Sequence, residues 1–157
     1  MSKATVVPVL RELVRCYQSF ERASGAHVRS LGFTPAQFDI IATLGNTRGM
    51  TFRELGTRTL ITKGTLTGVV DRLAGRGIVQ RCDHPSDGRA TLVRLTPRGE
   101  RAFREVFDPH LAFMQPAFEA LSESDRAALV RRLRSLREAL DRRMEALQSG
   151  PSRRKAA

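Results

Sequence analysis

The chain has 157 residues and a formal net charge of +11, from 27 Lys and Arg against 16 Asp and Glu. Its hydrophobic content of 41% is enough for a folded core, so a wholly disordered chain is excluded. No apolar run is long enough to span a membrane, and the first residues lack the features of a secretion signal. Two cysteines are too few for a disulfide framework, so we expect a cytoplasmic protein with reduced thiols.

The excess of positive charge is concentrated in the middle of the chain. Residues 48–98 hold 10 basic and 4 acidic residues, and this difference is more than half of the net charge of the chain. A concentrated basic surface is typical of proteins that bind the phosphate backbone of nucleic acids. A solvated basic surface that keeps a protein in solution explains the charge alone equally well.

Apolar periodicity and capping residues predict four helices in the first half of the chain. Thr34-Pro35 is an N-cap followed by proline, and Thr51 with Glu54 forms a capping box. The third helix, which this box begins, is expected to bury Phe52 and Leu55. The four helices are expected at residues 6–31, from 35 to about 45, from 51 onward over a short stretch, and at about 62–76.

The pattern then changes to that of a β-hairpin followed by two more helices. Residues 78–82 and 90–95 are expected to be strands, with the turn-forming residues 84–88 between them. Thr96-Pro97 begins a fifth helix, which Pro109 and Pro116 should break or kink.

The last helix begins at the N-cap Ser122 and carries an apolar stripe at nearly heptad spacing. Such a stripe requires a partner helix. Its members are Leu129, Leu133, Leu136, Leu140, Met144 and Leu147.

The helix predicted over residues 62–76 has two contrasting faces. One face is apolar and should pack on the core; it carries Leu66, Val69, Val70 and Leu73. The opposite face is small, hydroxylated and locally basic, and it carries Gly64, Thr65, Thr67, Gly68, Asp71 and Arg72. A face of this kind can enter a major groove and reach base edges. Thr62 and Lys63 lie at the helix N-terminus, where a phosphate is favoured. With the preceding short helix, this segment predicts a helix-turn-helix.

The hairpin that follows is interpreted as a wing. Its tip carries Arg89, a side chain that narrow minor grooves attract, and Asp87, which could hold the guanidinium in place. Arg72, Arg76 and Arg81 are candidate phosphate anchors.

The run from Met50 to Gly99 resembles the MarR family of winged-helix transcriptional regulators. The family's wing signature is an Asp-x-Arg, an apolar strand, Leu-Thr and a Gly, matched by Asp87, Arg89, Leu95, Thr96 and Gly99. The resemblance covers the whole chain and implies a fold that is mainly α with a small β-wing. A winged helix-turn-helix at residues 35–98 would be flanked by dimerisation helices at 1–34 and 99–149, with a basic disordered tail at 150–157.

The resemblance also implies a homodimer bound to a pseudo-palindromic operator. Members of the family are usually repressors, released from DNA by a small phenolic or aromatic carboxylate ligand or by thiol oxidation. Many relatives carry a basic residue where this chain has Gly68. Base specificity is therefore expected to depend more on Thr65, Thr67 and Arg72.

The effector is not identified by the sequence. His27 lies near the cleft where ligands of the family bind, and Phe33, Phe38 and Phe113 could line that cleft. A histidine satisfied in the core or exposed at the surface, and aromatic residues in the core, are the alternatives.

Redox sensing, metal binding and catalysis are weaker interpretations of the sequence. Cys16 lies where peroxide-sensing relatives hold a reactive cysteine, but the chain has one tyrosine, Tyr17, to stabilise a thiolate. A metal site at Cys82-Asp83-His84 is disfavoured because neighbours along a strand point to opposite faces. No enzyme motif is present and no cofactor is implied. A sequence-indifferent architectural DNA-binding protein remains the alternative to a regulator.

Overall fold

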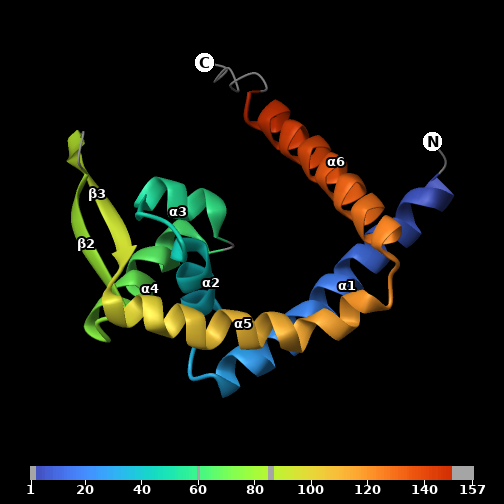
Figure 1. Ribbon diagram of the computed structural model, residues 1–157. Coiled ribbons are helices and arrows are strands. Elements are labelled where there is room, and N and C mark those ends of the chain that lie inside the picture. The colour runs from blue at the N-terminus through green and yellow to red at the C-terminus, as the bar shows by residue number, and fades with distance from the viewer. Residues whose placement is uncertain (1–2, 60, 85–86, 150–157) are drawn as a thin grey trace, which may run out of the picture. The chain divides into compact units, whose positions relative to one another are not determined.

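The computed structural model describes residues 3–59, 61–84 and 87–149, with side chains in these ranges except at 3–4, 63, 84 and 87–89 (Figure 1). The fold is mainly helical with one small sheet, as the sequence predicts. The chain divides into two compact units, residues 1–114 and 115–157. The elements are α1 (Lys3–Ser30), α2 (Pro35–Leu44), β1 (Met50–Thr51), α3 (Phe52–Arg58), α4 (Lys63–Gly75), β2 (Val79–His84), β3 (Asp87–Leu95), α5 (Pro97–Glu119) and α6 (Glu123–Gln148).

Side-chain caps fix the starts of the short helices. The Thr34 hydroxyl accepts from the Gln37 backbone N–H at 3.2 Å, and the Gln37 side chain accepts from the Thr34 N–H at 3.0 Å. Thr51 and Glu54 form the same reciprocal pair at the start of α3. Each box satisfies two backbone donors that the helix itself leaves unpaired. The predicted starts of α2 and α3 are therefore confirmed.

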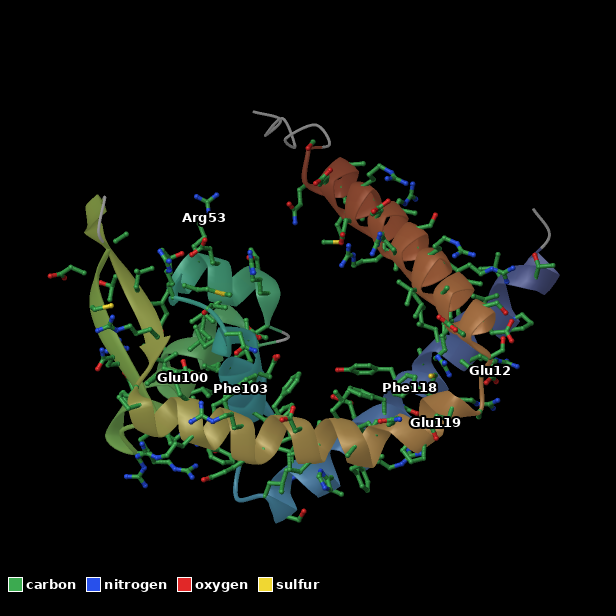
Figure 2. The ribbon with its side chains drawn as sticks, in the orientation of Figure 1. Glu12, Arg53, Glu100, Phe103, Phe118 and Glu119 are labelled. Atoms are coloured by element: carbon green, nitrogen blue, oxygen red, sulfur yellow. The ribbon has the colours of Figure 1, made fainter. Side chains whose placement is uncertain are left out.

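The core of the first unit lies among α2, α3, α4, the sheet and the beginning of α5. Leu55 is fully buried as predicted, whereas Phe52 is only half-buried against the edge of this core. Phe103 of α5 lies against α2 (Figure 2), where its ring fills the space beside Gly45. The core thereby connects the first turns of α5 to the helix-turn-helix.

The sheet differs from the predicted hairpin in two respects. Its strands are longer than 78–82 and 90–95, because His84 pairs with Asp87 across the register irregularity that follows Asp83. Residues 85–86 of the predicted turn lie outside the described residues. A third strand, β1, pairs with Leu92 and Val93 on the other edge of β3. Backbone pairing with a distant strand leaves no periodic signal in two residues, so β1 was not predicted.

Helix α5 runs unbroken through Pro109 and Pro116, so of the predicted break or kink the break is wrong. A proline removes one backbone N–H and leaves the carbonyl four residues earlier without its partner. Those carbonyls belong to Glu105 and Ala112, which are both exposed, so water can bind them. The helix therefore continues at a tolerable cost.

Large apolar side chains remain exposed along three helices. Helix α6 has no buried residue within its own unit, although its apolar stripe is formed as predicted. Helix α1 exposes Val6, Leu10, Val14 and Phe20, and α5 exposes Leu111 and Phe113. None of the helices within the described ranges combines the length and apolar character needed to cross a bilayer. Apolar surface of this extent is typical of a protein–protein interface.

Candidate nucleic-acid interface and aromatic cluster

Helix α4 presents the two faces that the sequence predicts. Leu66, Val69, Val70 and Leu73 are buried, with exposed fractions of 0–3%. The opposite face is exposed apart from Gly68, which is half-buried; it comprises Gly64, Thr65, Thr67, Gly68, Asp71 and Arg72. The preceding helix α3 packs against α4, and its Arg53 extends away from the helix surface (Figure 2). The polar face of α4 is therefore exposed, and it is accessible to a DNA groove.

The N-terminus of α4 carries a pair of hydroxyl groups. Thr62 is the N-cap residue, and its side chain makes no capping bond to the helix backbone. Its Oγ1 instead lies 3.0 Å from Oγ1 of Thr65, and both residues are exposed. The side chain of Lys63 lies outside the described side chains. The hydroxyl pair stands where the positive end of the helix dipole favours an anion.

Arg72 covers the small residue one turn earlier on the same helix. Its Nη1 lies 3.5 Å from the position that a Cβ at Gly68 would occupy. Long side chains on helices lean toward the helix N-terminus, which explains this direction. The guanidinium therefore supplies positive charge at the surface of residue 68.

Asp71 and Arg81 form an ion pair with a distance of 2.7 Å between Oδ1 and Nη2. The Arg81 guanidinium also lies 5.2 Å from the ring centre of Phe52. Both partners are exposed, so the pair contributes little to stability. Its effect is on charge, because it offsets the carboxylate that would otherwise repel phosphate from this face.

Arg76 and Arg89 were both predicted to contact DNA, and the structure describes the side chain of Arg76 alone. Arg76 stacks on Phe33, with 4.4 Å from Cζ to the ring centre, and donates to Gly32 O and Gln37 Oε1 at 3.4 and 3.5 Å. These contacts hold Arg76 at the C-terminal end of α4, far from the groove-facing end. Arg89 and Asp87 belong to β3, but their side chains lie outside the described side chains.

The structure brings three of the four predicted cleft residues together around a histidine that the sequence analysis passed over. His27 stacks on Phe113 with centroids 4.1 Å apart, and Phe38 meets His110 edge-on at 4.7 Å. His110 is 8% exposed, and its Nδ1 lies 3.1 Å from Nδ1 of His27. Phe33 lies apart from this cluster, under Arg76. We call His27, Phe38, His110 and Phe113 the aromatic cluster.

His110 could have been found from the sequence. It precedes Phe113 by three residues, a spacing that places two side chains on the same face of a helix. Helix α5 carries both residues to α1 and α2.

Burial is the main cause that lowers the pKa of His110 below its ordinary value, and repulsion from His27 lowers it further. Two nitrogens 3.1 Å apart require one ring to donate and the other to accept a hydrogen bond. Nε2 of His110 also lies 3.2 Å from the Ser24 hydroxyl. Burial thus favours the neutral form of His110, and Nε2 of His27 is the ring nitrogen that these two contacts leave open beside the aromatic rings.

Stability is expected to fall in mild acid because of His110. An unfolded histidine has a pKa of about 6.5, so between that value and the lower folded pKa the unfolded chain binds more protons. The contribution of His110 to the free energy of unfolding is therefore fully present above about pH 6.5. It is lost as the pH falls through the folded pKa. Urea unfolding of His110→Gln should show a shallower pH dependence. His84→Gln is the matched control, and an unchanged slope in His110→Gln would contradict the assignment.

Tyr17, the candidate partner of a Cys16 thiolate, directs its hydroxyl to Glu21. Cys16 is exposed, and the hydroxyl of Tyr17 donates to Glu21 at 2.9 Å, a bond that raises the pKa of Tyr17. Cys82 is half-buried, with Sγ 3.9 Å from Leu92 O. Within the described ranges, no group of three or more His, Cys, Asp or Glu side chains could hold a metal ion.

Comparisons with known proteins agree with this geometry. Residues 31–90 match the model of the MarR family. The HTH-type transcriptional regulator MhqR of Bacillus subtilis is 26% identical over 113 residues, which are 72% of this chain and 78% of MhqR.

Solved structures of regulators are similar over most of the chain. The structure of BpsR from Bordetella bronchiseptica has a TM-score of 0.72 and 28% sequence identity, and it covers 82% of this chain and 91% of BpsR. The DNA binding of BpsR is regulated by 6-hydroxynicotinic acid. The structure of AbsC, a MarR-family regulator from Streptomyces coelicolor, has a TM-score of 0.79 at 23% identity, covering 90% and 97%.

Proposed function

Because the chain belongs to the MarR family of winged-helix transcriptional regulators, we propose that it is a cytoplasmic homodimeric repressor of a pseudo-palindromic operator. The observation that carries this proposal is the exposed polar face of α4 opposite its buried apolar face. In the dimer, the two copies of α4 would enter successive major grooves, about 34–36 Å apart.

The contacts divide by chemistry. Thr65, Thr67 and Arg72 face outward on α4 and would reach base edges, with Gly64 allowing close approach. Thr62 and Lys63 at the helix N-terminus would bind phosphate. On the wing, Arg81 would contact the backbone and Arg89 the minor groove, with Asp87 supporting Arg89.

Arg72→Ala is expected to weaken binding to the selected operator by about 10- to 100-fold and to relax discrimination at one base pair. The reason is that the Arg72 guanidinium lies over Gly68 on the groove-facing surface of α4, where it can donate to a base edge. Affinity for operator variants at fixed salt would measure both effects. Arg142→Ala on α6 removes the same charge and should leave discrimination unchanged. A uniform loss across all sequences for Arg72→Ala would contradict base contact.

The proposed dimer is supported by the exposed apolar surface. Helix α6 has 26 residues and buries none of them within its unit, while α1 leaves valine, leucine and phenylalanine side chains exposed. A second copy of the chain would bury these side chains and position two recognition helices at once. Burial of apolar surface contributes about 25 cal/mol per Å², so an interface of this kind favours association strongly.

We propose the aromatic cluster as the effector site. Its rings can stack on a planar ligand, and Nε2 of His27 can hydrogen-bond a phenol or a carboxylate. His27 comes from α1 and His110 from α5, so a ligand there contacts two elements with exposed apolar faces. A ligand that binds the DNA-incompetent state better weakens operator affinity by its differential affinity for the two states.

The effector proposal predicts that 6-hydroxynicotinate weakens operator binding by about tenfold and that His27→Ala abolishes this response. His27→Ala should bind the operator normally without the ligand, because His27 lies on α1 and not on α4. Fluorescence anisotropy of labelled operator, titrated with the ligand, measures both. Arg29→Ala is the control, because Arg29 is exposed on the same helix as His27 and is not part of the aromatic cluster. A response that persists in His27→Ala would place the ligand elsewhere.

A further inference from the structure

A cleft lies in the first unit, separate from the aromatic cluster and from the groove-facing side of α4. It has a volume of about 570 Å³ and is formed by the end of α1, the end of α4 and the first turns of α5. Its polar lining consists of three arginines and one glutamate: Arg76, Arg98, Arg101 and Glu105. Phe33 and Val106 contribute to its apolar lining, and both are at least nine-tenths buried.

The charge in this cleft is not balanced by the protein. Three guanidinium groups face one carboxylate, which leaves an excess of two positive charges. Among the described residues, none of the three arginines lies within 4.0 Å of a carboxylate oxygen. The nearby Glu105 therefore does not neutralise Arg101, although the two are four residues apart on α5.

Part of this site is already held in place. Arg76 is fixed over the ring of Phe33, and both of its hydrogen bonds use Nη1. Arg98 passes over the turn after α4, with Cδ 3.9 Å from the position of a Cβ at Gly77. An anion that binds here would not have to order the Arg76 side chain from solution, which lowers the cost of binding.

DNA is not the partner that this position fits. Helix α4 has 13 residues and is therefore about 20 Å long, and Arg76 follows its C-terminal end. The cleft is thus about two Debye lengths from the N-terminal residues that approach the groove, at physiological salt. Guanidinium groups bind carboxylate and phosphate oxygens in bidentate pairs.

We propose that this cleft is a binding site for a small dianion, a phosphate group or a dicarboxylate, held by Arg76, Arg98 and Arg101. The site is independent of the proposed effector site, with which it shares no residue. It joins the end of the recognition helix to α5 through the ligand.

The test is isothermal titration of the full chain, without DNA, with inorganic phosphate and with phthalate at constant ionic strength. We expect saturable binding of one dianion per chain, at least tenfold weaker in Arg98→Gln and in Arg101→Gln. Arg104→Gln is the matched control, because Arg104 is exposed on the same helix and does not line the cleft. Binding of only one probe would distinguish phosphate from dicarboxylate as the ligand class.

Two results would overturn the proposal. One is the absence of saturable binding for both probes; the other is an equal loss in all three arginine variants, which indicates a diffuse cationic surface. Neither result bears on operator binding, because no DNA is present in the measurement.

Discussion

Leu133→Glu is expected to convert the proposed dimer to a monomer and to weaken operator binding by at least about 100-fold. Leu133 lies in the apolar stripe of α6 and is 45% exposed in the single chain. In the dimer it would be buried, where an unpaired carboxylate costs several kcal/mol. A monomer presents one recognition helix and loses the second half-site. Light scattering coupled to size-exclusion chromatography and operator titration measure the two effects.

Ser135→Glu is the matched control for this variant. It adds the same charge two residues away, which on a helix is about 200° around the axis and off the stripe. The control should remain dimeric and bind the operator normally. A dimeric Leu133→Glu protein would show that the stripe on α6 is not the interface.

Gly99→Ala is expected to lower the free energy of unfolding by about 3 kcal/mol. A Cβ at residue 99 would overlap the backbone carbonyl oxygen of Ile78, and backbone atoms cannot rotate away as a side chain can. The same corner is held by Thr96, whose hydroxyl donates to Gly77 O at 2.6 Å and accepts from Gly99 N at 3.0 Å. The substitution would therefore push α5 away from the turn that follows α4.

Chemical denaturation of Gly99→Ala and Gly75→Ala in parallel tests this prediction. Gly75 lies in the last turn of α4, and a Cβ there meets no atom within 4 Å. Gly75→Ala should be neutral or stabilise by up to about 1 kcal/mol, since alanine is the better helix former. Equal stability of the two variants would contradict the tight packing at Gly99.

Local signals in the sequence were sufficient for most of the fold. Thr34 and Thr51 mark helix starts through side-chain bonds made within three residues, so the pattern and the structure agree. The two faces of α4 follow from helical periodicity and are confirmed by burial. These features depend only on neighbours in the chain.

What the sequence did not reveal depends on distant partners or on solvent. Strand β1 exists because β3 lies beside it, and Met50-Thr51 alone has no strand period. Pro109 is tolerated because the carbonyl it frees is at the surface, a fact that requires the fold. His110 was missed because its partners lie on α1 and α2, and it completes the aromatic cluster with side chains from three helices.

The residues predicted to contact DNA also divide into those that follow from local sequence and those that depend on packing. Outward-facing Thr65 and Thr67 were predicted from the helical period alone, whereas the position of Arg72 over Gly68 depends on side-chain direction. Likewise, Arg76 was predicted as a phosphate anchor, but the structure stacks it on Phe33 from a loop more than 40 residues earlier. Charge identifies candidate contacts, and packing decides which of them face the partner.

Selection of genomic DNA fragments by the purified protein, at about 0.15 M salt, tests the central claim most directly, because non-specific binding is weak there. We predict enrichment of one inverted repeat whose half-site centres are about 10–10.5 base pairs apart, as two copies of α4 in successive grooves require. Uniform enrichment without a motif would contradict the proposed operator and favour a sequence-indifferent architectural protein with the same fold.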